Sequence, residues 1–305
     1  MLKGIVLAGG SGSRLFPATR VSSKQLLPIY DKPMIYYPLT TLMLVGIRDI
    51  LIISQADNLP KYQALFDDGA GLGMQIEYAA QEEPKGIAEA LLIADAAHFL
   101  SGADRVALIL GDNVFHGADL KKKFSQAALD LLGRGQAGDR ATIFITQVRD
   151  PQRYGVAELD DEGQVLGIAE KPKNPKSSWA VTGLYFYPVP WAVRITQGLK
   201  PSTRGELEIT DLNRAFLLLG CLDAVTLGRG FAWLDTGTPE ALLQASAYVE
   251  AIQSRQGRLI GSPEEAAFEQ GWITLDDLWH LAKAYPNEYG DNLRSLVVQR
   301  RRKQV

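Results

Sequence analysis

Residues 5–14 read Ile5-Val6-Leu7-Ala8-Gly9-Gly10-Ser11-Gly12-Ser13-Arg14, a short apolar run that passes directly into a glycine-rich turn. The apolar run predicts a buried strand over residues 4–8. Three glycines within four residues allow the backbone to adopt positive φ and to approach a ligand closely. Successive backbone N–H groups in such a turn form a concavity that binds anions. The stretch therefore predicts a phosphate-binding turn at the end of the first strand.

Two basic residues, Arg14 and Lys24, follow at a distance that lets them fold back toward the same anion. A guanidinium binds phosphate oxygens in a forked geometry, whereas an ammonium acts as a point charge. Two familiar phosphate motifs are absent: no Gly-x-x-x-x-Gly-Lys-Ser/Thr occurs, and Leu15 stands where the dinucleotide fingerprint requires glycine. A tight strand-to-helix connection without a ligand would explain the glycines alone. It accounts less well for the glycines together with Arg14, Lys24 and Gln25.

Short apolar runs alternate with helix-like stretches through the first two-thirds of the chain. The predicted strands are residues 4–8, 49–54, 75–79, 106–110 and 141–147, and the predicted helices are residues 36–45, 62–66 and 87–98. Such alternation predicts an α/β fold, with a mostly parallel central sheet covered by helices on both faces.

The pattern changes after Arg149. Residues 155–159 and 164–169 predict an antiparallel hairpin with a polar turn. Further strands are expected at residues 179–187, 222–227 and 231–234, a loop at 133–138, and helices at 239–256, 263–270, 275–284 and 290–298. The last three helices predict a small helical appendage.

The composition excludes several classes of protein. With 305 residues, 22% charged residues and a net charge of −3, the chain is unlike a nucleic-acid coat or a polybasic membrane binder. The basic run at residues 300–303 is interpreted as a frayed, solvated end. No stretch approaches the roughly 18 continuous apolar residues of a membrane span. We expect a soluble, cytoplasmic protein that binds neither nucleic acid nor membrane.

The cysteine and histidine content argues against a disulfide framework and against a zinc site. Cys221 is the only cysteine, so no intramolecular disulfide can form. The three histidines, His98, His116 and His280, are scattered and have no cysteine cluster beside them.

Two aspartates follow predicted strands directly. Asp112 comes after the run at residues 106–110, where Gly111 leaves room for a ligand, and Asp235 comes after residues 231–234. In open α/β sheets, ligands bind beyond the carboxyl ends of the strands. Two such carboxylates suit one hard divalent cation such as Mg²⁺, completed by phosphate oxygens and water. Each aspartate alone would also fit a turn or a helix cap.

Several separated motifs together resemble the sugar nucleotidylyltransferases, most closely the bacterial glucose-1-phosphate thymidylyltransferases. The opening signature comprises residues 7–14, Ser23-Lys24-Gln25-Leu26-Leu27-Pro28 and Lys32-Pro33-Met34. Later matches are Arg153-Tyr154-Gly155-Val156, Glu170-Lys171-Pro172 and residues 181–185 and 204–211. The likeness runs almost the full length of the chain. It implies a Rossmann-like catalytic core over residues 1–240, with a nucleotide half (about 1–150) and an inserted antiparallel sugar-phosphate half (about 151–240), followed by a helical segment over residues 241–305.

The resemblance also implies an activity. Members of this group transfer a deoxythymidylyl group from dTTP to α-D-glucose 1-phosphate with the help of Mg²⁺, giving dTDP-glucose and pyrophosphate. This is the first step toward dTDP-deoxysugars such as dTDP-rhamnose, which enter O-antigens and other cell-surface polysaccharides. The group forms homotetramers. The alternatives are the same chemistry with another nucleotide or sugar 1-phosphate (UTP, for example) and a non-catalytic sugar-nucleotide sensor; the broken glycine fingerprint argues against a nicotinamide dehydrogenase.

Site residues follow from the matching motif positions. The resemblance assigns catalysis to Arg14, Lys24, Asp112 and Lys171, and metal binding to Asp112 and Asp235. The implied nucleotide-binding residues are Leu7, Gly9, Gly10, Gly12, Ser13, Arg14, Lys24, Gln25, Gln81 and Gly86. The implied sugar-phosphate-binding residues are Asn113, Tyr154, Gly155, Glu170, Lys171, Val181 and Arg204.

Two departures from the family pattern leave properties open. The family's Gln-Pro-x-Pro-x-Gly-Leu-Ala reads Gln-Glu-Glu-Pro-Lys-Gly-Ile-Ala here, and the changes at Glu82 and Lys85 leave the strictness of base selection open. The tail resembles a segment that helps to form an effector site between subunits. The family commonly has arginine where Glu269 stands, and an acidic residue would repel the diphosphate of a product inhibitor. We therefore expect weak feedback inhibition.

Overall fold

The structure is a computed structural model that describes residues 1–133 and 139–302. Most of the loop expected at residues 133–138 lies outside the described residues, as does Lys303.

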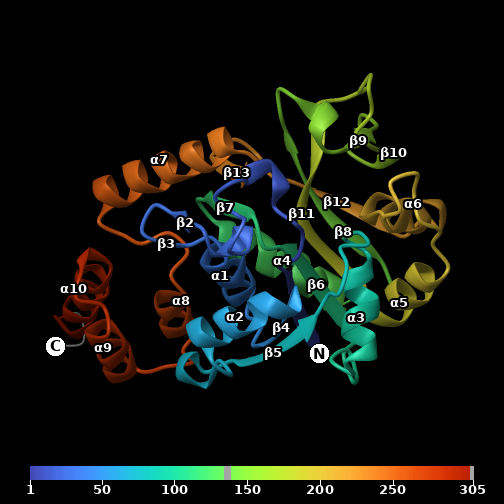
Figure 1. Ribbon diagram of the computed structural model, residues 1–305. Helices are drawn as coiled ribbons and strands as arrows, with labels where there is room; N and C mark the ends of the chain where they lie inside the picture. Colours follow the sequence, from blue (N-terminus) through green and yellow to red (C-terminus); the bar gives the residue numbers. More distant parts are fainter. Residues whose placement is uncertain (134–138, 303–305) are drawn as a thin grey trace.

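A nine-stranded mixed sheet forms the centre of the molecule (Figure 1). Four strands pair in parallel, in the order β6-β1-β4-β5, and form its first half. They are β1 (Leu2–Leu7), β4 (Asp49–Ser54), β5 (Gln75–Ala80) and β6 (Arg105–Leu110). These strands are apolar runs that the sequence predicted to within a few residues, because strands buried on both faces of a parallel sheet need apolar side chains throughout.

The second half of the sheet is built around a long strand, β11 (Trp179–Pro188), which is antiparallel to β6, β8 and β9. The predicted hairpin is present as β9 and β10, and β12 pairs in parallel with β8. These strands are β8 (Ala141–Gln147), β9 (Gly155–Leu159), β10 (Val165–Glu170) and β12 (Leu222–Thr226). Within the described part of the sheet, β10 and β11 run against the other strands, so the predicted mostly parallel sheet is confirmed.

Helices cover both faces of the sheet, as predicted. Side chains alternate along β1: Val6 packs with α1, α2 and α4, whereas Ile5 and Leu7 pack with α3, α5 and α6. The first group of helices is α1 (Tyr36–Val45), α2 (Leu59–Phe66) and α4 (Leu120–Gly133). The second group is α3 (Glu89–Ala96), α5 (Val189–Gln197) and α6 (Ile209–Leu218).

Several elements were not predicted from the apolar pattern. They are the helices α4, α5 and α6, the short strand β7 (Asn113–Gly117), and the two-residue strands β2 (Pro28–Ile29) and β3 (Lys32–Pro33). β7 forms only after pairing with β13 (Phe231–Asp235), which lies more than a hundred residues away in the sequence. The start of α4 carries three consecutive lysines, which hide its buried residue Phe124 in a polar stretch.

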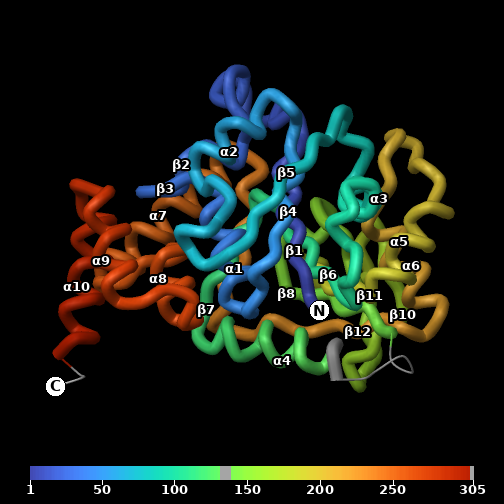
Figure 2. The backbone as a smooth tube through the Cα atoms, turned by 90° about the horizontal axis from the view of Figure 1, so that it is seen from below, coloured from blue at the N-terminus to red at the C-terminus, as the bar shows by residue number. Residues whose placement is uncertain are grey.

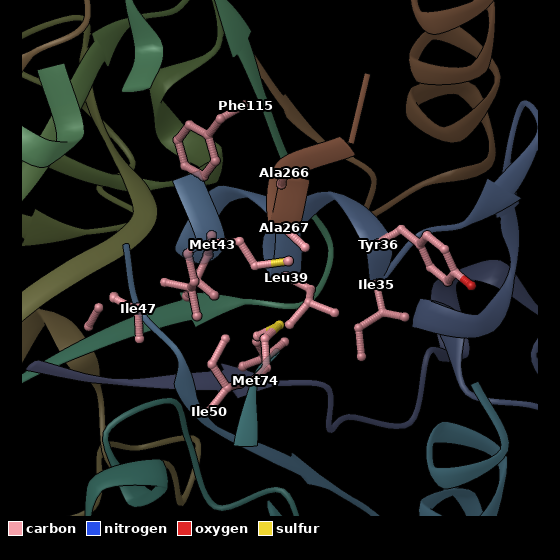
Figure 3. Packing of buried hydrophobic residues seen from close by; sticks show 14 of the residues in the cluster. Ile35, Tyr36, Leu39, Met43, Ile47, Ile50, Met74, Phe115, Ala266 and Ala267 are labelled. Atoms are coloured by element: carbon pink, nitrogen blue, oxygen red, sulfur yellow. The ribbon is translucent and has the colours of Figure 1, made fainter. Parts of the chain in front are cut away.

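Four helices complete the chain, and they lie at the opposite end of the molecule from α5 and α6 (Figure 2). They are α7 (Pro239–Gln256), α8 (Pro263–Glu269), α9 (Leu275–Lys283) and α10 (Glu288–Arg302). Ala266 and Ala267 of α8 face Leu39 and Met43 of α1 in one apolar cluster (Figure 3). The buried carboxylate of Glu264 accepts hydrogen bonds from the hydroxyls of Tyr285 (2.8 Å) and Tyr289 (2.5 Å). The predicted helical appendage is therefore anchored on the core.

The basic end expected at residues 300–303 is helical rather than frayed over its first three residues, although Arg301 and Arg302 are exposed to solvent as expected. α10 continues through Arg302, and the guanidinium of Arg301 lies 2.6 Å from Asp276 Oδ1. Arg300 lies 4.0 Å from Glu269. Acidic residues of α8 and α9 therefore face Arg300 and Arg301. None of the helices in the described residues is long and apolar enough to cross a membrane.

Candidate active site

A cleft of about 560 Å³ opens at the carboxyl ends of β1 and β6. β11 shapes it. One edge of β11 pairs with β9 through Trp179 and Ala180 and with β6 from Leu184 onward. Between these two pairings the edge is free, and Val181 and Gly183 line the cleft there.

The structure brings most of the predicted site residues into this cleft. Those that line it are Leu7, Gly9, Arg14, Gln25, Asp112, Asn113, Tyr154, Gly155, Glu170, Lys171, Val181 and Asp235. Those that are not part of its lining are Gly10, Gly12, Ser13, Lys24, Gln81, Gly86 and Arg204. Lining residues absent from the predicted set are Ile87, Leu110, Arg153, Gly183, Tyr185, Ile209, Thr210 and Trp233.

The glycine turn has the conformation that the sequence predicted. Gly10 and Gly12 have φ of +98° and +59°, and the hydroxyl of Thr19 donates to the carbonyl oxygen of Gly12 at 2.7 Å. At Gly9 a Cβ would lie only 2.2 Å from Oε1 of Gln81. A side chain at Gly9 would displace the amide of Gln81, whereas Gly10 and Gly12 are favoured by their backbone conformation.

The two basic residues of the opening signature differ in environment. Lys24 is buried, and its Nζ lies 2.5 Å from Oδ2 of Asp112. Arg14 is exposed in the short 3-10 turn Ser13–Leu15, and it lines the cleft on the side of Asp235 and Gly237. Arg14 is therefore free to turn toward a ligand, whereas Lys24 already holds one of the two aspartates.

The two aspartates interact electrostatically. Burial alone would raise the pKa of Asp112, but the charge and hydrogen bond of Lys24 outweigh it and hold that pKa below its usual value. Burial, and then the charge of Asp112, raise the pKa of Asp235. Arg153 approaches Asp235 only to 3.8 Å. The charges of Lys24, Arg153 and Arg14 offset the burial and repulsion at Asp235 only in part, and a cation bound between the carboxylates would relieve the remainder.

The donor set fits Mg²⁺ that is completed by substrate. No group of three or more His, Cys, Asp or Glu side chains in the described residues could hold a metal by itself. Mg²⁺ is usually bound through one or two carboxylates, with phosphate oxygens and water filling the remaining positions. Asp112 and Asp235 match that requirement.

Asn113 holds the two aspartate-bearing segments together. Its Nδ2 donates to Asp112 Oδ1 at 2.9 Å, and its Oδ1 accepts from the backbone N–H of Gly183 (3.0 Å) and from the indole N–H of Trp233 (2.6 Å). Trp233 lies on β13 two residues before Asp235, and its ring packs on Tyr154 with centroids 4.9 Å apart. Both acceptor positions of the Asn113 oxygen are therefore occupied within the protein, while its amide nitrogen keeps a second N–H donor.

At the other end of the cleft, Glu170 is fixed by its neighbours. Its Oε2 accepts from the hydroxyl of Thr210 at 2.5 Å, and its Oε1 lies 3.2 Å from Nζ of Lys171. Lys171 has φ of +40°, and its backbone N–H donates to the carbonyl of Tyr154 at 3.0 Å. A non-glycine residue in this region carries backbone strain of about 1–3 kcal/mol, and such strain often accompanies functional sites.

Arg204 faces acidic residues rather than the open cleft. It bonds both oxygens of Glu208 at 2.8 Å and approaches Glu170 to 3.5 Å. Glu208 is buried, and Arg204 and Ser202 satisfy its carboxylate. Arg204 can meet a phosphate only by giving up part of this arrangement.

Comparison with known proteins identifies the class. A sequence profile of the nucleotidyl transferase family matches residues 3–252, and the chain belongs to this family. It is 53% identical over 297 residues to the glucose-1-phosphate thymidylyltransferase of Xanthomonas campestris pv. campestris strain B100, covering 97% of each chain. The enzyme of the same name from Neisseria meningitidis serogroup A is 49% identical, with 97% and 99% covered.

Solved structures agree with these relatives. A Bacillus anthracis structure described as a glucose-1-phosphate thymidylyltransferase in complex with a sucrose matches with a TM-score of 0.72 and 38% identity, covering 81% of this chain and 95% of that one. A UDP-glucose pyrophosphorylase complexed with UDP-glucose matches with a TM-score of 0.70 and 26% identity, covering 82% and 100%. The predicted enzyme class and fold are confirmed.

A second, smaller cavity of about 160 Å³ lies between α1, β7 and α8. Glu265 and Glu269 line it together with His116. Burial, and then the charge of Glu269, raise the pKa of Glu265 to about 7, although Arg258 and Arg300 act in the opposite direction. The cavity wall formed by α8 is therefore acidic.

Replacing Glu265 with glutamine is expected to remove a pH dependence of stability. The pKa of Glu265 in the folded chain lies above its ordinary value of 4.5. The stabilisation that protonated Glu265 gives to the folded state is therefore complete below pH 4.5, and it is lost as the pH rises through about 7. Between pH 5 and pH 8 the wild type should lose about 2–3 kcal/mol of unfolding free energy that Glu265→Gln retains. Urea unfolding at both pH values measures this, with exposed Glu162→Gln as the matched control. Parallel pH profiles for the wild type and Glu265→Gln would contradict the raised pKa.

Proposed function

We propose that this nucleotidyltransferase transfers the deoxythymidylyl group of dTTP to α-D-glucose 1-phosphate and releases pyrophosphate. One observation carries the proposal: a single cleft has the glycine turn and Arg14 at one end, Glu170 and Lys171 at the other, and the aspartate pair on its lining. Relatives named for this reaction are 47–53% identical over 97% of the chain. The product dTDP-glucose would then feed dTDP-deoxysugars such as dTDP-rhamnose.

The proposed chemistry is an in-line displacement at the α-phosphorus of dTTP. An oxygen of the sugar phosphate forms the new P–O bond, and the bond to pyrophosphate breaks. No general base is required, because the attacking phosphate is already ionised at neutral pH. Such reactions depend on positioning and on electrostatic stabilisation of the transferring group.

Each group of residues has a proposed role. Arg14 would bind the triphosphate and stabilise the leaving pyrophosphate, while Lys24 holds Asp112 in place and adds positive charge. Glu170 would accept hydrogen bonds from sugar hydroxyls, and Lys171 would align the attacking phosphate. Mg²⁺ held by Asp112 and Asp235 would supply a Lewis acid for the phosphate oxygens.

We also propose how the chain is divided and where it works. Residues 1–240 form the catalytic core, with a nucleotide half up to about residue 150, and residues 241–305 form the helical segment. The four C-terminal helices would contribute to the contacts of a homotetramer. Its substrates are small water-soluble phosphates, which supports a cytoplasmic location.

A pyrophosphate-release panel tests the proposal. Purified protein is assayed with dTTP, UTP, dCTP and GTP, each combined with several sugar 1-phosphates. We expect the highest kcat/KM for dTTP with glucose 1-phosphate. A preference for UTP over dTTP would favour the alternative in which the same reaction uses UTP, in line with the fold likeness to UDP-glucose pyrophosphorylase. Sugar-nucleotide binding without pyrophosphate release for any pair would favour a sensor.

Feedback inhibition by dTDP-rhamnose is expected to be weak in the wild type. Glu269 places negative charge in the cavity beside α8, where a diphosphate would be repelled. Glu269→Arg should strengthen inhibition by about tenfold, because it replaces repulsion with attraction across the same cavity. Inhibition constants for both proteins measure this, with Glu162→Gln as the control. Strong inhibition of the wild type would contradict the expectation.

A further inference from the structure

Two buried glutamines, Gln25 and Gln81, meet at Gly9, where the glycine turn enters the cleft. Nε2 of Gln25 donates to the carbonyl of Gly9 at 3.3 Å, and Oε1 of Gln81 lies where a side chain on Gly9 would be. Each glutamine is only 3% exposed. An amide has a donating end and an accepting end, so its orientation decides what a ligand must offer in return.

Glu89 determines the orientation of Gln81. Oε2 of Glu89 accepts from Nε2 of Gln81 at 2.7 Å and from the backbone N–H of Lys85 at 3.2 Å. A carboxylate can only accept hydrogen bonds. The amide nitrogen of Gln81 must therefore face Glu89, and its oxygen must face Gly9.

The position of Glu89 is itself fixed by the loop that precedes it. Glu89 is the first residue of α3, where the helix N-terminus favours a negative charge. The loop is pinned to Leu207, whose N–H donates to the carbonyl of Lys85 (2.6 Å) and whose carbonyl accepts from Ala88 (3.2 Å). Gly86 has φ of +109°, and a Cβ there would lie 2.3 Å from the carbonyl oxygen of Leu207. Glu89 is consequently held by backbone contacts as well as by Gln81.

The oxygen of Gln81 is free to accept a hydrogen bond from a ligand. Within the described residues, Oε1 of Gln81 accepts no hydrogen bond, although its nitrogen donates one. The fully buried side-chain atoms without a partner in that part of the chain are in Thr40, Thr182 and Asn213, so this oxygen is reachable from outside. An acceptor left unpaired when a ligand covers it is costly.

Gln25 presents the complementary end of its amide. Its Oε1 accepts from the hydroxyl of Ser23 at 2.6 Å, and that hydroxyl in turn accepts from Tyr62 at 2.8 Å. The amide nitrogen is therefore the end of Gln25 directed at Gly9, with a second N–H available. Together the two glutamines offer one donor and one acceptor next to Gly9.

We propose that Glu89 is a positioning residue for base selection: by orienting Gln81, it makes the site require a base with an N–H donor next to a carbonyl. Thymine and uracil have this arrangement at N3, whereas the N3 of cytosine is an acceptor and would face the oxygen of Gln81. The proposal rests on the proposed function, in which Gln81 meets the base. It adds a residue that orients the recognition group without touching the substrate.

The test compares Glu89→Gln with the wild type. A glutamine at position 89 can donate as well as accept, so Gln81 is free to turn over. The ratio of kcat/KM for dTTP to that for dCTP should fall by about tenfold or more, mainly through KM. Calorimetric Kd values for dTTP and dCTP, measured without sugar phosphate, should show the same change. Glu83→Gln is the matched control, because Glu83 is an exposed glutamate in the same loop that pairs only with Lys85.

The outcomes separate this inference from the proposed function. The role of Glu89 would be overturned if folded Glu89→Gln kept the wild-type ratio of kcat/KM for dTTP to that for dCTP. It would also be overturned if the wild type did not distinguish dTTP from dCTP. In both cases the proposed reaction would still stand on pyrophosphate release. A wild type that binds dTTP more tightly than dCTP but releases no pyrophosphate would overturn the reaction, and loss of that binding preference in Glu89→Gln would still support the inference. Glu89→Met, of similar length but without hydrogen-bonding oxygens, serves if Glu89→Gln does not fold, and it should lose the same selectivity.

Discussion

Arg14→Ala is expected to lower kcat for pyrophosphate release by about 10²–10³-fold, the usual cost of removing one preorganised charge from a transition state. Arg14 is an exposed cation on the side of the cleft that is proposed to bind the triphosphate, whereas Lys24 is already paired with Asp112. The leaving pyrophosphate gains negative charge as the bond breaks, so the loss should fall on kcat as well as on the KM for dTTP.

The matched control is Arg20→Ala, an exposed arginine of the same loop that does not line the cleft. Steady-state kinetics at saturating glucose 1-phosphate measure both variants. Near-native turnover of Arg14→Ala would remove Arg14 from the chemical step, and an equal loss in Arg20→Ala would show that loop structure is responsible.

Asp112→Asn is expected to lower Mg²⁺-dependent pyrophosphate release by about 10²–10³-fold. The substitution removes one of the two carboxylates proposed to bind the metal, and it also leaves the buried ammonium of Lys24 without its partner. The Mg²⁺ concentration for half-maximal rate should rise, because a neutral amide binds a hard cation less well than a carboxylate.

A direct readout accompanies the kinetics of Asp112→Asn. Mn²⁺ binding in the presence of dTTP, followed by electron paramagnetic resonance, should weaken in Asp112→Asn and in Asp235→Asn. It should not change in Asp161→Asn, which lies in the exposed β9–β10 turn. Unchanged metal dependence in Asp112→Asn would contradict the metal assignment.

The parts of the fold that could be predicted are those whose burial is visible in the local sequence as a run of apolar residues. Strands β4 and β6 were predicted within a residue because they are buried on both faces. β7 could not be, since its only strand partner is β13, and the register joins Asn113 to Asp235. The helical end of α10 was missed because Arg300 and Arg301 look solvated until acidic residues of α8 and α9 are placed opposite them.

The site residues likewise divide into those that have a local sequence signature and those that do not. The glycine turn and the strand-end aspartates have local signatures, and the structure places Gly9, Asp112 and Asp235 in one cleft. Thr210 and Trp233 were missed because their roles come from contacts with Glu170 and Asn113, 40 and 120 residues away. No local pattern distinguishes such a threonine or tryptophan from an ordinary core residue.

The shared edge of β11 has a consequence for how the two substrates are held. Val181, near the pairing with β9, and Tyr185, beside β6, belong to one strand, β11, whose register with β8 shifts between these two residues. The separation between the proposed sugar-phosphate half-site and the proposed nucleotide half-site would therefore be set by this single stretch of backbone. A one-residue insertion between Val181 and Leu184 would leave both half-sites chemically intact and still keep the attacking oxygen out of reach of the phosphorus.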